Sequence, residues 1–186
     1  MLQCLRRLPN STQLADTIPR IIAAYRADHE PWVVGYSGGK DSTAVVKLVV
    51  QSLLRVRTRH KPVTVVYCDT GVEIPMAAAL ARKALHGLEK EARAFDLPIY
   101  TKVVSPPLSE RFFVKVIGRG YPPPTDKFRW CTDRLRIDPV SRFLRSQKLV
   151  SATVVLGVRE SESSTRQLTL SENKTALHKN SKRPAF

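Results

Sequence analysis

The sequence predicts an α/β fold in which a parallel sheet carries helices on both faces. The expected strands are continuous apolar runs and do not alternate with polar residues, which is typical of strands buried on both faces. Segments with helical periodicity separate them, as in sheets built from crossover connections. A length of 186 residues with 42% hydrophobic side chains is enough for one domain of ordinary size.

The expected elements follow in chain order. Apolar side chains at three- and four-residue spacing from Leu14 to Tyr25 predict an opening amphipathic helix. Short apolar runs bounded by polar turns then predict strands, and the longer segments between them predict helices, one of them rich in alanine. The expected strands are 31–36, 63–68, 97–104 and 151–158, and the expected helices are 43–54, 76–95 and 135–144.

Unusual polar residues lie where the expected strands end, at 37–42, 69–73 and 157–166. In parallel sheets, ligands bind beyond the carboxyl ends of the strands, so we expect one site at this rim. Residues 105–130 are rich in proline and predict a long irregular excursion over the same rim. Loops of such length in compact domains are usually functional or disordered.

The charge of the chain favours a polyanionic partner. Thirty-one Lys and Arg residues face 16 Asp and Glu residues, which gives a net charge of +15. Basic side chains concentrate at 111–148, with ten basic and three acidic residues, and at 47–61, with five basic and none acidic. A field of that sign suits DNA, RNA or clustered phosphates. The alternative is a generally basic surface that serves solubility.

Cysteine usage and hydropathy indicate a cytoplasmic protein. Cys4, Cys68 and Cys131 are three residues at wide spacing, which makes no disulfide framework and indicates a reducing compartment. No apolar run approaches the ~18 residues of a membrane span. The first residues also offer no secretory signal, so we expect no membrane partner.

The segment SGGKDS at residues 37–42 is the strongest candidate for a binding loop. It follows an expected strand and precedes an expected helix, so its glycines and the helix N-terminus can approach an anion. Lys40 adds a mobile positive charge. Its glycine spacing, with Asp41 after the lysine, differs from that of a Walker A loop. The alternative is a structural tight turn.

Other candidates surround this loop in the expected fold. Asp69 and Glu73 could bind ribose, metal or substrate, or could cap the following helix. Arginine side chains match phosphate oxygens in two places at once, although each could equally be a solvated charge. Aromatic rings could stack on a base, and Trp130 could equally anchor a core. The arginines are Arg129, Arg134, Arg159 and Arg166, and the other aromatic residues are Tyr121 and Phe128.

These motifs together resemble the PP-loop ATP pyrophosphatases of the phosphoadenosine-phosphosulfate reductase branch. The matching segments are SGGKDS at 37–42, DTGVE at 69–73, RWCTDRL at 129–135 and GVR at 157–159 with the ESxxR pattern at 162–166. GYPPP leading into FRWCTDRL is most similar to the DndC family, and nearly as similar to SspD, the sulfur-transfer components of DNA phosphorothioation systems. The resemblance implies an N-terminal helical segment at 1–30, a PP-loop domain at 31–166 and a basic tail at 167–186, shorter than in relatives.

The resemblance implies the adenine nucleotide alpha hydrolase-like fold and its chemistry. In such enzymes the loop holds the β- and γ-phosphates of ATP, and attack at the α-phosphorus gives an adenylated target and pyrophosphate. The implied nucleotide-binding residues are Ser37, Gly38, Gly39, Lys40, Asp41, Ser42, Asp69, Gly157 and Arg159, with Lys40 and Asp41 catalytic and Asp41 also the carboxylate for Mg²⁺. The implied substrate-binding residues are Glu73, Arg129, Arg134, Glu162, Ser163 and Arg166.

Cys131 is the candidate for sulfur chemistry. Its position between Arg129 and Arg134 predicts a lowered pKa of the thiol and a better nucleophile. The resemblance implies that it is a catalytic sulfur carrier or a ligand of an iron–sulfur cluster. Three cysteines cannot supply the four ligands of such a cluster within one copy. We expect Cys68 to be a small buried apolar residue.

The leading interpretation is an ATP pyrophosphatase, forming AMP and pyrophosphate, that adenylates its target for sulfur incorporation into the DNA backbone. The partners implied are DNA, a cysteine desulfurase as sulfur donor, other phosphorothioation subunits and a second copy of the chain in a homo-oligomer. One alternative is a sulfonucleotide reductase that uses Cys131 without consuming ATP. The other alternative is a non-catalytic subunit that senses nucleotide and binds DNA.

Overall fold

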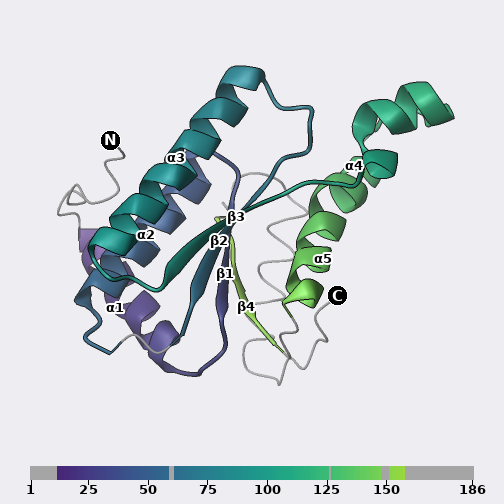
Figure 1. Ribbon diagram of the computed structural model, residues 1–186. Helices are drawn as coiled ribbons and strands as arrows, with labels where there is room; N and C mark the ends of the chain where they lie inside the picture. The colour runs from purple at the N-terminus through teal and green to yellow at the C-terminus, as the bar shows by residue number, and fades with distance from the viewer. Residues whose placement is uncertain (1–11, 59–60, 126, 148–150, 158–186) are drawn as a thin grey trace.

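A four-stranded parallel sheet forms the centre of the protein, as the sequence predicts. The computed structural model describes residues 12–58, 61–125, 127–147 and 151–157. The strand order is β3-β2-β1-β4 (Figure 1). The strands are β1 (Trp32–Tyr36), β2 (Val63–Cys68), β3 (Ile99–Val104) and β4 (Thr153–Val155).

Helices cover both faces of this sheet. The helices α1 (Thr12–Arg26), α2 (Lys40–Arg55) and α3 (Pro75–Ala94) lie on one side of the sheet, and α5 (Asp138–Ser146) lies on the other (Figure 1). α1 packs on α2, and α3 packs on β3.

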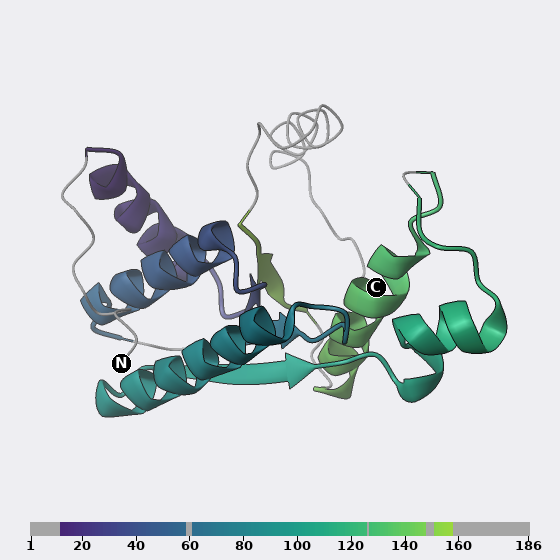
Figure 2. The same cartoon turned by 90° about the horizontal axis from the view of Figure 1, so that it is seen from above.

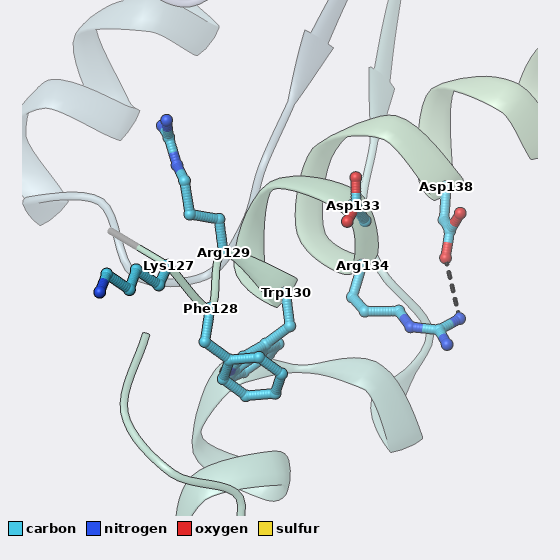
Figure 3. Close-up of a pocket in the computed structure, with 7 residues that line it drawn as sticks. All are labelled: Lys127, Phe128, Arg129, Trp130, Asp133, Arg134 and Asp138. Atoms are coloured by element: carbon cyan, nitrogen blue, oxygen red, sulfur yellow. Dashed lines mark hydrogen bonds and ion pairs between the residues drawn. The ribbon is translucent and has the colours of Figure 1, made fainter. Parts of the chain in front are cut away.

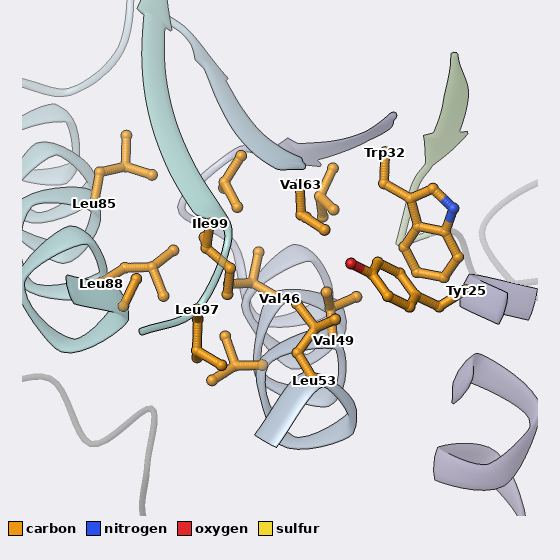
Figure 4. Packing of buried hydrophobic residues seen from close by; sticks show 14 of the residues in the cluster. Tyr25, Trp32, Val46, Val49, Leu53, Val63, Leu85, Leu88, Leu97 and Ile99 are labelled. Atoms are coloured by element: carbon orange, nitrogen blue, oxygen red, sulfur yellow. The ribbon is translucent and has the colours of Figure 1, made fainter. Parts of the chain in front are cut away.

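The two faces of the sheet bury different amounts of apolar surface. On the α2 side, alternate strand residues such as Val34 and Val65 pack against Val49 of α2 and Leu85 of α3, and Figure 4 shows part of this cluster. On the α5 side, a smaller cluster joins Val33, Val66 and Val104 to Val140 and Phe143. Burial on both faces explains why the strands are continuous apolar runs.

A buried lysine holds together the amino-terminal end of the sheet. The side chain of Lys61 is 1% exposed, and its Nζ lies 2.6 Å from Oδ1 of Asp28. The same Nζ lies 5.1 Å from the ring centroids of Tyr25 and Trp32. The Tyr25 hydroxyl donates a 2.6 Å hydrogen bond to the Lys61 carbonyl. These contacts tie the end of α1 to the segment that leads into β2.

The excursion at 105–130 is more regular than expected. It contains a 3₁₀ turn, η2 (Leu108–Glu110), and a π-helical turn, η3 (Val114–Gly118), so the expectation of an irregular segment is wrong there. Its prolines lie outside 108–121, which leaves that stretch free to form helical turns.

The other boundaries moved by a few residues. The helix expected at 135–144 begins with α4 (Trp130–Thr132), continues through the π-helical η4 (Asp133–Ile137) and ends in α5. α2 begins at Lys40, inside the glycine motif, and β4 is shorter than expected. The expected tail at 167–186 lies outside the described residues.

We predict that Asp28→Asn destabilises the fold at neutral pH. The hydrogen bond from Lys61 is the main cause that lowers the pKa of Asp28. A carboxyl whose pKa is lower in the folded state stabilises the fold above its unfolded pKa of about 4, and that contribution is lost as pH falls through the folded pKa. Urea unfolding at pH 7 and pH 3 should therefore show a difference between wild type and variant at pH 7 that shrinks at pH 3. An equal difference at both pH values would contradict this.

Candidate functional site

The loop at residues 37–42 is held by its own hydrogen bonds. The Ser37 amide donates to Oγ of Ser42 at 3.1 Å, and that hydroxyl donates to the Gly39 carbonyl at 3.0 Å. The two serine hydroxyl oxygens lie 3.0 Å apart. Gly38 has φ +77°, and a Cβ there would lie 3.1 Å from Cβ of Ala81 on α3. The sequence therefore needs glycine at this position for both its conformation and its space.

The outer surface of this loop can receive an anion. Ser37, Gly38, Gly39 and Lys40 are exposed, whereas Ser42 is buried and holds the loop. α2 begins directly after Gly39, and no described side chain caps its first turn. Nζ of Lys40 lies 3.9 Å from Oδ2 of Asp41, a loose pair on an exposed lysine. A helix N-terminus with a mobile cation is a favourable place for phosphate.

The end of β4 lies directly against this loop. A Cβ on Gly157 would lie 3.0 Å from the carbonyl carbon and oxygen of Asp41 and 3.1 Å from the Ser42 amide nitrogen. The structure thus brings Gly157 to the loop, as expected for strand ends at one rim. The other expected residues of this segment lie outside the described residues: Arg159, Glu162, Ser163 and Arg166.

Asp69 and Glu73 form a turn of their own at the end of β2. The Asp69 carboxylate pairs with Arg82 of α3 and accepts a 3.1 Å hydrogen bond from the Gly71 amide. Oε1 of Glu73 accepts hydrogen bonds from the hydroxyl and the amide of Thr70, at 2.7 and 3.3 Å. Neither carboxylate caps α3, whose N-cap is Ile74 without a side-chain hydrogen bond. The capping alternative is therefore wrong.

Sequence reasoning missed Arg82. This arginine neutralises Asp69 across 13 positions of chain and adds a cation to the rim. A general signal was present, since a carboxylate at the end of a strand attracts a cation from the next helix. No motif marks which basic residue of α3 is used.

A concave surface lies at the start of α4, apart from the loop at 37–42. Its volume is about 360 Å³. Arg134 on its wall pairs with Asp138 at 3.2 Å, and its Nε lies 4.0 Å from Oε2 of Glu110. Figure 3 shows the side chains of Arg129 and Arg134 extending away from one another, so they form no joint clamp. The lining residues are Lys127, Phe128, Arg129, Trp130, Asp133, Arg134 and Asp138.

Trp130 anchors a small core and is not an exposed platform for a base. Its ring stacks on Phe112, with centroids 5.8 Å apart and planes at 16°, and meets the ring of Tyr121 edge-on. Its Nε1 donates a 3.1 Å hydrogen bond to the Pro122 carbonyl. Of the three aromatic candidates, Phe128 combines an exposed ring with a place on the concave surface.

The two described cysteines differ in environment. Sγ of Cys68 donates a 2.9 Å hydrogen bond to the Leu135 carbonyl, and burial, with a contribution from Glu73, raises the pKa of this thiol to about 11. Cys68 is only partly buried, although it packs in the α5-side cluster as expected. Cys131 is the second residue of α4 and is partly exposed.

An iron–sulfur cluster does not fit these cysteines. Cys68 and Cys131 are the two cysteines among the described residues, whereas such a cluster is commonly held by four. Among the residues that the structure describes, no group of three His, Cys, Asp or Glu side chains could hold a metal ion.

In the described part of the chain, no helix is long and apolar enough to cross a membrane.

A parallel α/β sheet with a glycine loop at a helix N-terminus defines a nucleotide-binding class of fold. Residues 31–182 match the phosphoadenosine phosphosulfate reductase domain, and the chain belongs to this family. Members of the family are PP-loop enzymes of adenylation and sulfur transfer.

One sequence relative and one protein of similar fold are both longer than this chain. An uncharacterized protein of Methanocaldococcus jannaschii is 26% identical over 156 residues, which are 84% of this chain and 27% of that protein. The solved structure of the U34-tRNA thiolase NcsA from Methanococcus maripaludis, with its [4Fe-4S] cluster, matches with a TM-score of 0.52 at 15% identity. That match covers 94% of this chain and 57% of the thiolase chain, and it supports the shared fold.

We predict that Gly157→Ala weakens ATP binding. The new Cβ would meet backbone atoms of Asp41 and Ser42 near 3.0 Å, so the loop must move. Overpacking of this kind costs about 1–3 kcal/mol, and we expect the affinity for ATP to fall about tenfold. Gly118→Ala is the matched control, because its Cβ would meet only a side-chain atom of Val114 at 3.9 Å. Equal ATP affinity of the two variants in calorimetric titration would contradict the prediction.

Proposed function

We propose that the chain is an ATP pyrophosphatase that adenylates its target for sulfur incorporation into the DNA backbone, as in the DndC and SspD proteins. The observation that carries the proposal is the loop at residues 37–42, whose residues 37–40 are exposed, which includes the uncapped start of α2 and which lies against Gly157. Backbone amides, a helix N-terminus and Lys40 together suit a polyphosphate better than a single small anion. The family to which the chain belongs supports the same chemistry.

The geometry of the loop supports the adenylation step that we propose. A non-bridging oxygen of a DNA phosphate attacks the α-phosphorus of ATP, and the bond to the β-phosphate oxygen breaks. Pyrophosphate leaves with that electron pair, and AMP stays on the DNA phosphate. The amides of Gly38 and Gly39 and the ammonium of Lys40 stabilise the charge that grows on the departing phosphates. Ser42 keeps the loop in shape through its bonds to Ser37 and Gly39.

The loop at 37–42 contains one carboxylate that could hold Mg²⁺. Magnesium in phosphoryl-transfer sites is commonly held by one or two carboxylates and the substrate phosphates. Asp41, in the first turn of α2 with a side chain 34% exposed, is the carboxylate of the loop that would hold it. When bound, the ion would neutralise phosphate charge.

Sulfur transfer requires a second centre, and we assign it to Cys131. A cysteine desulfurase would convert this thiol to a persulfide, whose terminal sulfur attacks the activated DNA phosphorus and displaces AMP. Two equivalents of a thiol reductant then cleave the S–S bond, which frees Cys131 and leaves sulfur on the phosphorus. Both cysteines are partly exposed, but the thiol of Cys68 donates a hydrogen bond to the Leu135 carbonyl and has a raised pKa, so Cys68 is the poorer candidate for such exchange.

The name of the matched family favours a second candidate, a sulfonucleotide reductase. Such an enzyme would reduce a small sulfonucleotide through Cys131 and would not consume ATP. The net charge of +15 supports DNA as the larger partner, because a small anion needs only a local basic pocket. Other phosphorothioation subunits and a second copy of the chain complete the partners that we propose.

Products formed from ATP separate these functions. We predict that the purified chain with ATP, Mg²⁺, DNA and a desulfurase forms AMP and pyrophosphate, and that Lys40→Ala lowers the rate by about 10²–10³-fold. Lys83→Ala, an exposed lysine of α3, is the control and should keep the wild-type rate. ADP with phosphate would contradict adenylation, and reduction of a sulfonucleotide without ATP use would establish the second candidate.

We predict that Cys131→Ser abolishes sulfur transfer and leaves pyrophosphate release intact, because phosphate binding is assigned to the loop. Cys68→Ser is the control, since its hydroxyl can still donate to the Leu135 carbonyl. With a pKa of about 11, only about one Cys68 thiol in ten thousand is ionised at pH 7. Alkylation should therefore modify Cys131 before Cys68, and mass spectrometry measures the order of modification. Sulfur transfer by Cys131→Ser at the wild-type rate would exclude the assigned role.

A further inference from the structure

Residues 108–119, which we name the projecting segment, stand out from the body of the protein (Figures 1 and 2). One side of this segment packs inward. Phe112 stacks on Trp130, and the buried Lys115 lies 3.0 Å from Oε2 of Glu110 and over the ring of Tyr121. These contacts fix the rotation of the helical turn, so its other side cannot turn inward.

The segment also carries three large apolar side chains that face water. Leu108 is 68% exposed, Phe113 is 58% exposed and Ile117 is 78% exposed. Phe113 and Ile117 are four residues apart and share one face of the turn. One edge of the Phe113 ring meets the ring of Phe112 at a centroid distance of 5.5 Å, and more than half of the Phe113 side chain remains open to water. Clustered exposed apolar side chains usually mark a contact surface.

The charges around this apolar face point to the chemistry of its partner. Between residues 105 and 129, the exposed charged side chains that the structure describes are all positive: Arg111, Arg119, Lys127 and Arg129. The described acidic residue of that stretch, Glu110, is paired with Lys115. Exposed apolar side chains with the cations Arg111 and Arg119 beside them complement a strand of nucleic acid, which presents apolar base faces between phosphates.

We infer that the projecting segment is a nucleic-acid contact surface on which Phe113 and Ile117 touch bases while Arg111 and Arg119 contact the flanking phosphates. The inference rests on the proposed function, with DNA as its target, and adds that bases are contacted as well as the backbone. Base faces are covered in a stacked duplex and open in a single strand. The surface should therefore bind single-stranded DNA more tightly than duplex DNA of equal length.

Fluorescence anisotropy of the full chain with labelled single-stranded and duplex oligonucleotides tests this surface. The double variant Phe113→Ala with Ile117→Ala should bind single-stranded DNA about tenfold more weakly, with the same salt dependence. Arg111→Gln with Arg119→Gln should make the slope of log affinity against log salt shallower by about two units. Met76→Ala with Leu80→Ala removes equally exposed apolar side chains of α3 and should change nothing.

The outcomes separate this inference from the proposed function. If the wild type and the Phe113, Ile117 variant bind DNA with equal affinity, the projecting segment is not the contact surface, and DNA remains the proposed target. Failure of the wild type to bind either oligonucleotide overturns both. The Phe113, Ile117 variant could instead bind DNA as the wild type does and lose self-association in size-exclusion chromatography. That result would make the face a contact between protein chains and would also overturn the inference. Circular dichroism confirms that each variant is folded.

Discussion

Parallel pairing of β1 with both β2 and β4 is the constraint on which the candidate site depends. β1 lies between these two strands, and all three run in the same direction, so the residues that follow them reach one rim. The loop at 37–42, the turn at 69–73 and Gly157 are distant in sequence and lie at one rim of the sheet for this reason. A glycine at 157 allows the closest of these approaches, because a Cβ would collide with the backbone of the loop.

The sequence was sufficient to predict the parts of the fold that depend on local pattern. Continuous apolar strands gave the parallel sheet, and SGGKDS marked the turn between β1 and α2. Long-range polar pairs were not predictable. The partner of Lys61 lies 33 positions away, and that of Asp69 lies in α3, where several basic residues were equivalent by sequence. The helical turns at 108–119 were missed because nearby prolines were read as breaking the whole excursion.

Two kinds of chemistry are divided between two parts of the molecule in the function that we propose. Phosphate binding belongs to the rim of the sheet, and sulfur handling belongs to the helix that begins at Trp130. The thiolase of similar fold carries a [4Fe-4S] cluster, whereas the described part of this chain holds two cysteines and no group of three possible metal ligands. The proposed sulfur chemistry therefore depends on Cys131, and the projecting segment, which we infer to contact the nucleic acid, packs against the neighbouring Trp130 through Phe112.

The central claim is that the loop at 37–42 holds the two phosphates that leave as pyrophosphate. Amide hydrogen exchange of the full chain, measured with ATP, pyrophosphate or AMP at equal concentration, tests this most directly. We predict slower exchange at the amides of residues 38–42 with ATP and with pyrophosphate alone, and no change there with AMP alone. Slower exchange with AMP alone, or no change with ATP, would contradict the claim.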